Sequence, residues 1–390
     1  MAEAYIVAAA RTAGGKKGGR LKDWHPVDMG AKVIDALLDR SGVDPAAVED
    51  VICGCVMQVG QQAVNVARNA AMASRLPESV PATSVDRQCG SSQQSLHFAA
   101  QAVKSGSMDC VIAMGIESMT RVPMGASVML AMKENMGTYM SPGLQKKYPN
   151  IQFSQFMGAE MMAEKYKLTK DRLDEFAYQS HQKAIAATQG GKFKKEIVPL
   201  KIKLEDGSET DHTVDEGIRF DVSLEGIKGV KLLREGGAIT AATSSQICDG
   251  ASGVMVVNEK GLKALGVKPL ARIHQMTVIG GDPVIMLEAP LPATKKALEK
   301  CGMKIGDIDL YEVNEAFASV PTAWLQYTGA DPGKLNVHGG AIALGHPLGA
   351  SGTKLMTTLV NALHQENKRW GLQTMCEGGG LANVTIVERA

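Results

Sequence analysis

The chain has 390 residues, 45% of them apolar, so it can bury a large core and is expected to form two or three domains. Its 42 lysine and arginine residues nearly balance 41 aspartate and glutamate residues, which leaves no broad positive surface for nucleic acid or an anionic membrane. Seven cysteines, without the close spacing of a small secreted scaffold, favour a reducing compartment.

The first elements of the chain argue against export and membrane insertion. The apolar run from Ala4 to Ala10 precedes Lys16 and Lys17, so it predicts a first strand rather than a signal peptide. No stretch reaches the roughly 18 uninterrupted apolar residues that a membrane span needs, and Val387 to Ala390 is no peroxisomal address. We therefore expect a cytoplasmic protein with no membrane span and no nucleic-acid partner.

A repeated pattern predicts two related α/β halves. The run from Leu37 to Gly42 reappears in the same register from Ala297 to Gly302, among alternating β-branched runs and helical patterns. A stretch from about 120 to 247, first rich in methionine and then in lysine, separates the halves and is interpreted as an insertion. Residues 171–188 have the pattern of an amphipathic helix, so we expect this insertion to be ordered at least in part.

Two residues precede helical patterns at matching places in the two halves. Cys89 follows the extended run from Val80 to Val85, so it is predicted at a strand-to-helix elbow where the helix dipole favours a thiolate. His346 lies in a glycine-dense loop before a second helical pattern, where an imidazole could take a proton from a thiol. If the halves pack together, the two helix starts meet. A buried packing cysteine and a structural histidine are the alternatives.

Two more residues acquire a chemical interpretation only beside Cys89. Cys376 lies in a predicted hairpin with a glycine bend, between extended runs at 372–375 and 382–387, where a second thiol could act as acid or base. Asn314 follows a strand pattern, and it could organise an oxyanion hole or cap a helix.

The other candidate patterns predict no cofactor site. Cys53 and Cys55 lie within a strand pattern, have no second cysteine pair to complete a zinc site, and are expected in the core. The chain also has no strand that leads into a glycine-rich nucleotide loop or a Walker lysine loop. We therefore predict no metal and no permanently bound cofactor.

Taken in order, the blocks along the chain resemble those of the thiolase family, and the resemblance covers essentially the whole sequence. The blocks are Arg11-Thr12, the Cys89 elbow, Asn314-Glu315-Ala316-Phe317, Gly345-His346-Pro347, and Cys376 followed by Gly378. The resemblance implies a thiolase fold, in which two βαβαβαββ halves are stacked in five layers. The implied halves are residues 1–119 plus 248–270 and residues 271–390, and 120–247 would be an inserted loop domain that binds CoA.

The resemblance also implies a role for each site residue. Cys89 would be the acylated nucleophile, His346 its base and an oxyanion donor, and Cys376 the acid or base at the α-carbon. Asn314 would hold a water in one oxyanion hole, and the backbone N–H groups of Cys89 and Gly378 would form another. The implied contacts to CoA are Arg219, Ala241, Ser245, Ala316 and Phe317.

The implied reaction is the reversible, CoA-dependent cleavage of a 3-ketoacyl-CoA to acetyl-CoA and a shortened acyl-CoA, as in β-oxidation, by a homodimer or homotetramer. A biosynthetic thiolase that forms acetoacetyl-CoA, a ketoacyl synthase and a non-catalytic acyl-CoA-binding relative are the alternatives. Cys376 argues against the synthase, and the presence of both Cys89 and His346 argues against the non-catalytic relative.

The acyl group is not fixed by these blocks. Glu377 stands where isoleucine is commoner, and Met129, Met132 and Met136 share a predicted helical face that could line an acyl pocket or make a packing or subunit contact. These departures favour a medium or bulky acyl group.

Overall fold

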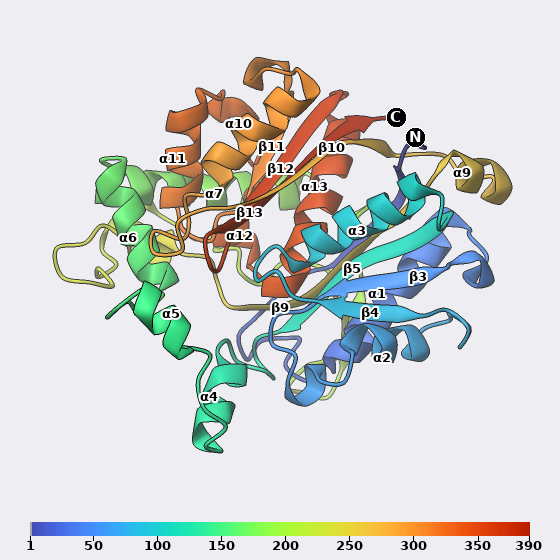
Figure 1. Ribbon diagram of the computed structural model, residues 1–390, viewed down its shortest axis with the longest axis horizontal. Helices are drawn as coiled ribbons and strands as arrows, with labels where there is room; N and C mark the ends of the chain where they lie inside the picture. The colour runs from blue at the N-terminus through green and yellow to red at the C-terminus, as the bar shows by residue number, and fades with distance from the viewer. Residues whose placement is uncertain (1) are drawn as a thin grey trace.

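The computed structural model describes residues 2–390 and has two α/β halves built on a mixed β-sheet (Figure 1). The strand order is β11-β12-β13-β10-β1-β9-β5-β3-β4, with β2 beside β9 and β6 beside β1. The strands of the first half are β1 (Tyr5–Thr12), β2 (Gly15–Lys16), β3 (Asp50–Gly54), β4 (Ala82–Val85), β5 (Cys110–Ser118) and β9 (Cys248–Val257). Those of the second half are β10 (Ala271–Gly280), β11 (Leu310–Val313), β12 (Trp370–Glu377) and β13 (Leu381–Arg389).

The pairing pattern of the first half recurs in the second. In the first half β3 and β5 are parallel, whereas β5–β9 and β9–β1 are antiparallel. In the second half β11 and β12 are parallel, whereas β12–β13 and β13–β10 are antiparallel. The counterpart of β4 is reduced to one parallel bridge between Tyr311 and Leu335. This repetition confirms the predicted α/β fold with two related halves.

The two halves join edge to edge through a short ladder. Strand β1 pairs with β10 at only two positions, Tyr5 with Arg272 and Ile6 with Ala271. Each half also has a register shift near this junction, after Ile6 in one ladder and after Ile273 in the other. Shifts of this kind bend a sheet, so the two half-sheets can turn and face each other across a shared helical layer.

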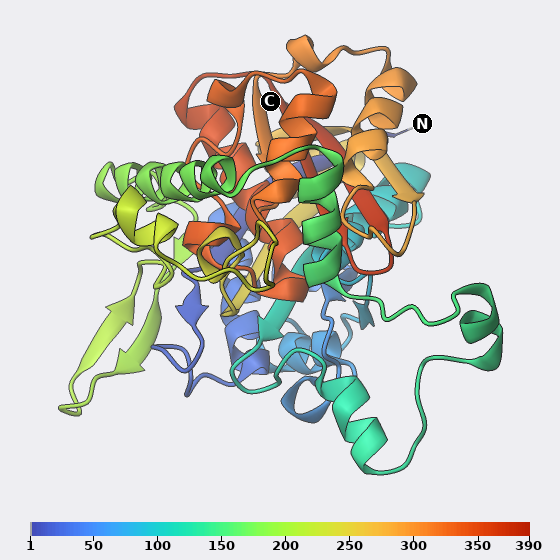
Figure 2. The ribbon, with the colours of Figure 1, turned by 90° about the vertical axis from the view of Figure 1, so that its left-hand side faces the viewer.

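Helices form three layers around the two half-sheets (Figures 1 and 2). Helices α1 and α2 cover one outer face, α10 and α11 cover the other, and α3 and α13 pack against each other in the centre. The apolar core is divided accordingly into an outer cluster on each side and a central one. The bounds are α1 (Pro26–Ser41), α2 (Val66–Ala73), α3 (Ser91–Ser105), α9 (Glu259–Leu265), α10 (Pro290–Cys301), α11 (Ser319–Thr328), α12 (Ala341–Leu344) and α13 (Ser351–Gln365).

The repeated sequence run explains the matching ends of α1 and α10. Gly42 and Gly302 follow these helices as C-caps, and both have φ of 69°. This left-handed conformation is open to glycine at little cost, which is why both copies of the run end in glycine.

The chain between β5 and β9 leaves the sheet and forms helices and short strands of its own. These are α4 (Ala126–Lys133), α5 (Pro142–Lys147), α6 (Gln155–Lys165), α7 (Lys170–Gln189), α8 (Leu224–Lys228), β6 (Ile197–Val198), β7 (Leu200–Lys203) and β8 (Glu209–His212). Helix α7 confirms the predicted amphipathic helix. Figure 2 shows α4 and α5 on an arm that projects from the body. Within residues 2–390, no helix is both long and apolar enough to span a bilayer.

The three methionines predicted to share a helical face lie on this arm. Met129 and Met132 are in α4 and are 58% and 60% exposed. The prediction was wrong for Met136, which lies beyond the end of α4 and is 79% exposed. Asn135 takes a positive φ of 55° immediately before it, so the helix cannot continue through this point.

Candidate active site

Cys89 lies at the predicted turn between β4 and α3, and local hydrogen bonds hold this turn. The Asp86 carboxylate accepts from the backbone N–H of Gln88 at 2.7 Å, and the Ser91 hydroxyl accepts from the N–H of Arg87 at 3.0 Å. Gln88 has φ of 50°, a conformation that costs free energy for a residue with a side chain and persists only where neighbours enforce it. The strand, the turn and the helix are therefore as predicted.

The starts of α3 and α13 are in direct contact, as the duplication predicted. The N–H of Thr353 donates to the Ser92 hydroxyl at 3.0 Å, and a Cβ at Gly352 would overlap the backbone of Gln93. One detail differs from the prediction. His346 is five residues before α13, because a 3₁₀ turn (Leu348–Ala350) lies between the histidine and the helix.

The hydrogen bonds of His346 define which ring nitrogen is free to accept a proton. The Ser351 hydroxyl donates to the carbonyl of Pro347 at 2.9 Å, so it can only accept from Nδ1–H of His346, 2.5 Å away. Nε2 is then unprotonated, and Asn314 Nδ2 lies 3.4 Å from it. Burial, and then the nearby Lys354 cation, lower the pKa of His346 to about 3. The imidazole is therefore neutral at physiological pH.

Asn314 does not cap a helix, so the simpler interpretation of this residue was wrong. It follows β11 directly, whereas α11 begins at Ser319 after a cap residue, Ala318, that has no capping side chain. The Asn314 side chain is 1% exposed, and its Oδ1 has no partner among the described residues. A buried amide oxygen without a partner is costly unless a ligand or water reaches it.

Cys376 is the penultimate residue of β12, and the predicted hairpin with its glycine bend is confirmed. Glu377 pairs with Leu381 across the bend, where Gly379 and Gly380 have φ of 82° and 76°. Cys376 is 1% exposed, and its pKa is raised by burial and then by Cys89, so the two sulfurs are close enough to interact.

The electrostatics of Cys89 differ from the expectation that its helix favours a thiolate. Burial raises the pKa of the Cys89 thiol to about 12, and Glu377 adds to the rise. The backbone N–H groups of Cys89 and Gly378 face the sulfur and lower this pKa. The resting thiol is therefore protonated, and it needs a base before it can attack a carbonyl.

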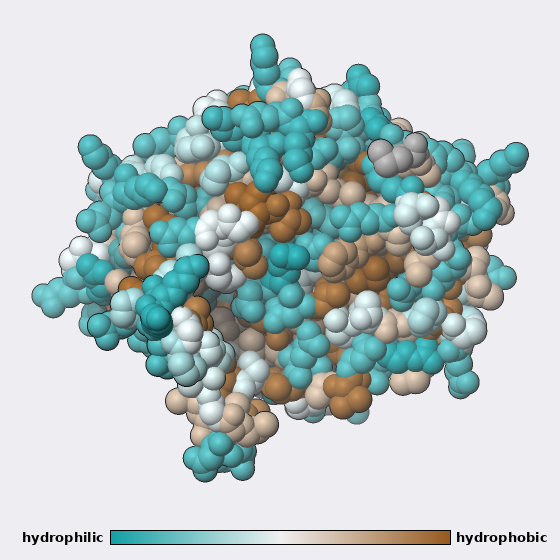
Figure 3. All heavy atoms as spheres, viewed as in Figure 1, coloured by the Kyte–Doolittle hydropathy of each residue, from teal (hydrophilic) through white to brown (hydrophobic). Residues whose placement is uncertain are grey.

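A cavity of about 980 Å³ lies beside Cys89. Cys89 and Gly378 line it, together with the insertion and the loop after β10. Its apolar lining includes Met57, Met124, Tyr139, Leu144, Phe153, Met286, Leu348 and Leu381. In the space-filling view, the surface is hollowed between the projecting arm and the body, with apolar side chains around the hollow (Figure 3). Cys376, His346 and Asn314 are all buried, at 5% exposure or less.

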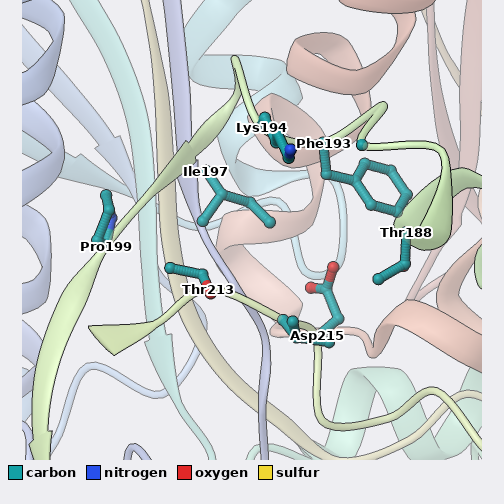
Figure 4. A pocket seen from close by; sticks show the side chains of 9 residues that line it. Thr188, Phe193, Lys194, Ile197, Pro199, Thr213 and Asp215 are labelled. Atoms are coloured by element: carbon teal, nitrogen blue, oxygen red, sulfur yellow. The ribbon is translucent and has the colours of Figure 1, made fainter. Parts of the chain in front are cut away.

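A second cavity, of about 320 Å³, lies between the end of α7 and strands β6 to β8 (Figure 4). Its walls include Phe193, Ile197 and Thr213, and Asp215 lies at its edge. It contains none of the predicted catalytic residues, so the cavity beside Cys89 is the candidate active site.

The structure brings together three of the five residues expected to contact CoA. The N–H of Ser245 donates to the carbonyl of Ala316 at 2.8 Å, and Ser244 forms a β-bridge with Phe317. Ala316 and Phe317 are buried, whereas Ala241 and Arg219 are exposed, and Arg219 has its backbone contact with His181 instead. None of the five lines the cavity beside Cys89.

Gln246, which sequence reasoning missed, connects the segment of Ser244 and Ser245 to the loop that bears His346, called here the histidine loop. Its side-chain amide donates to the backbone carbonyls of Gly217 and Ile342. Its backbone carbonyl accepts from the backbone N–H of His346 at 3.1 Å. The residue directly follows Ser245, so chain adjacency was the one available signal. Ser351 was also missed, although a serine at the start of a helical pattern is a signal for a capping or orienting role.

A buried network of charges supports the same loop. Arg11 binds Glu196 at 2.6 Å and Asp215 at 2.8 Å, and all three side chains are shielded from solvent. Lys354 lies 3.9 Å from Asp215 and donates to the carbonyls of Leu344 and Gly345 at 2.5 and 3.1 Å. The sequence identifies Arg11 only as part of the Arg11-Thr12 motif, whereas its two partners come from the insertion.

A half-buried thiol at a strand-to-helix turn, a second thiol whose titration is coupled to it, and a buried neutral imidazole define a class of α/β proteins with a cysteine-centred site. The comparisons agree on the family. The model for the thiolase N-terminal domain matches residues 4–260, and that for the thiolase C-terminal domain matches residues 267–389. The chain belongs to the thiolase family.

Several relatives match over nearly the whole length of both chains. A steroid 3-ketoacyl-CoA thiolase of Mycobacterium tuberculosis is 49% identical over 100% of this chain and 95% of its own. A 3-ketoacyl-CoA thiolase of Serratia proteamaculans is 40% identical over all of both chains. One of Pseudoalteromonas translucida is 41% identical over 98% of each.

Proposed function

We propose that this thiolase-family acyltransferase cleaves 3-ketoacyl-CoA with CoA, giving acetyl-CoA and a shortened acyl-CoA, through an acyl group carried on Cys89. The observation that carries the proposal is the position of Cys89 in the wall of a large apolar cavity, next to Cys376 and Gly378. The names of the relatives support the same reaction.

Each catalytic residue has a proposed task in this reaction. Neutral His346 takes the proton of Cys89, whose sulfur attacks the 3-keto carbon. The bond between C2 and C3 then breaks, its electron pair passes to acetyl-CoA as an enolate, and Cys376 gives that enolate a proton. A second CoA gives its thiol proton to Cys376 and attacks the acyl group on Cys89, whose sulfur leaves and takes back the proton held by His346.

The oxyanions of these steps also have proposed donors. The N–H groups of Cys89 and Gly378, which already face the sulfur, would bind the charge of the tetrahedral intermediate on Cys89. Asn314 and His346 would bind the enolate oxygen, directly or through a water held by Asn314.

A bulky acyl group fits the cavity best. Its volume of about 980 Å³ lies at the upper end of the range for small-molecule sites, and its walls are mostly apolar. The relative named as a steroid thiolase favours the same choice. The second candidate is a thiolase that forms acetoacetyl-CoA, which would use the same residues in reverse on a much smaller acyl group.

The remaining expectations stand as parts of the same proposal. Arg219, Ala241, Ser245, Ala316 and Phe317 would form the CoA contacts. CoA would be a co-substrate of a cytoplasmic homodimer or homotetramer that has no permanently bound cofactor. Residues 1–119 with 248–270 and residues 271–390 would be the two halves, and 120–247 the CoA-binding insertion.

The test is Cys89→Ser, assayed for CoA-dependent cleavage of straight, branched and ring-bearing 3-ketoacyl-CoA substrates. We expect kcat to fall by about 10³-fold or more, because a hydroxyl is a far weaker nucleophile than a thiolate. The matched control is Cys301→Ser, which changes a half-buried cysteine of α10 and should leave kcat unchanged. Cleavage that persists in Cys89→Ser would end the proposal, and a sharp preference for a four-carbon substrate would favour the second candidate.

A further inference from the structure

Glu377 is a buried acid placed between the second cysteine and the glycine of the proposed oxyanion hole. It is the last residue of β12, and its side chain is fully shielded from solvent. Neither of its carboxyl oxygens has a hydrogen-bond partner among the described residues. Burying an ionised carboxylate without a partner is very unfavourable, so an acid in this position remains neutral or serves a function.

The side chain of Glu377 reaches across to the loop that bears the first cysteine. A Cβ at Gly90 would overlap the Glu377 carboxyl group, so only glycine leaves room for it there. On the other side, the backbone at Gly378 packs against the side chain of Gln88. The carboxyl group is carried by the residue after Cys376 and lies against Gly90, the residue after Cys89, so it bridges the two cysteine-bearing loops.

The charged and titratable groups that face Glu377 are few. Burial raises the pKa of Glu377 to about 8, and the Arg87 guanidinium on the elbow partly opposes the rise. The carboxylate in turn raises the pKa of Cys89 and that of Cys376. At neutral pH the acid is thus mostly protonated, and its ionisation is coupled to both thiols.

We propose that Glu377 is a positioning residue of the cysteine pair, which serves as a neutral acid and whose ionisation sets the alkaline limit of Cys89 reactivity. The proposal rests on the proposed function, because it concerns the cysteine that would carry the acyl group. In the neutral form, the carboxyl group fills the space between the two loops and adds no charge beside the nucleophile.

The ionised form would act against the thiolate for a physical reason. The Cys89 sulfur and the Glu377 carboxylate lie at the same N-terminal end of α3, whose dipole and free N–H groups stabilise negative charge. Two anions at one such site repel each other, so the second ionises only at higher pH. Above the pKa of Glu377, its carboxylate therefore uses the stabilisation at the start of α3, and the thiolate of Cys89 forms less readily.

The test compares the wild-type chain with Glu377→Gln, which keeps the shape of the side chain and cannot ionise. The rate of alkylation of Cys89 by iodoacetamide is measured from pH 6.5 to 9.5, and the Cys89 peptide is quantified by mass spectrometry. We expect rates within about twofold at pH 6.5. At pH 9.5 the variant should react about tenfold faster, which corresponds to one unit in the pKa of the thiol.

Two further variants separate charge from packing. Glu377→Leu is also neutral, and it should show the same gain at alkaline pH even if it is less stable. The matched control, Glu299→Gln, removes an exposed carboxylate of α10 and should follow the wild-type profile. Profiles of wild type and Glu377→Gln that superimpose, a uniform slowing at every pH, or a gain in Gln without one in Leu would each overturn the proposal.

Alkylation needs no turnover, so the two proposals fail separately. If the wild-type chain cleaves no 3-ketoacyl-CoA but the alkylation profiles still diverge above pH 8, the proposed function is wrong and the role of Glu377 stands. If the enzyme is active and the profiles coincide, the proposed function stands and the role of Glu377 is wrong.

Discussion

The two halves share one strand pairing pattern, yet they fix their functional residues by different means. In the first half, Cys89 is two residues from α3, and side chains within five residues hold its turn. In the second half, a long glycine-rich loop replaces the direct turn, and His346 depends on Gln246, Lys354 and Ser351. The first half therefore has a locally determined geometry, whereas the loop of the second half also depends on long-range contacts with the insertion through Gln246 and Asp215.

The largest expected effect comes from Arg11, which joins the first half to the insertion. Arg11→Met would leave the buried Glu196 without its cation partner and Asp215 with only Lys354, 3.9 Å away. We expect the free energy of unfolding, measured with urea, to fall by about 3–5 kcal/mol. The exposed pair Arg75–Asp39 gives the control, because Arg75→Met should cost less than about 1 kcal/mol. Equal losses in the two variants would contradict the dependence on buried charges.

The next largest effect is expected from Lys354, which supports the histidine loop. Lys354→Met frees two buried carbonyls and removes the cation that helps to lower the pKa of His346. We expect kcat/KM at pH 7 to fall about tenfold. Burial still holds the imidazole pKa low, so its rise on loss of the cation protonates the base only in acid, and the deficit should grow as pH falls from 6 to 4.

Lys354→Arg keeps the positive charge and provides the comparison for that pH dependence. Its kcat/KM ratio to wild type should stay flat between pH 4 and 6, even if the longer side chain lowers the overall rate. A deficit of Lys354→Met that is independent of pH would show that Lys354 acts through packing alone.

The smallest effect is expected at the elbow, where the geometry is local. Asp86→Ala removes one short backbone hydrogen bond and two long side-chain ones, all from Gln88 in a partly solvated turn, so the free energy of unfolding should fall by only about 1 kcal/mol. Thermal unfolding of Asp86→Ala and Asp86→Asn measures this, because asparagine keeps an acceptor for the Gln88 N–H. A loss as large as that of Arg11→Met would remove the distinction between the halves.

Much of the fold could be predicted from local patterns. The elbow at Cys89, helix α7 and the β12–β13 hairpin all agree with the sequence, because each is set by residues close together in the chain. The contact between the starts of α3 and α13 also follows from the repeat around Gly42 and Gly302. Asn314 shows the limit, since the same residue after a strand could have been a helix cap.

What the sequence determined by itself was therefore the list of reactive residues and the local turns that present them. Only the tertiary structure decided the state of those residues, because protonation depends on which groups are buried together. The high pKa of Cys89, the neutral ring of His346 and the unpartnered acid at Glu377 all arise from burial, and Cys89 and Glu377 also act on each other from opposite ends of the chain. Desolvation and Coulomb interactions act through space, and a linear pattern carries no record of those distances.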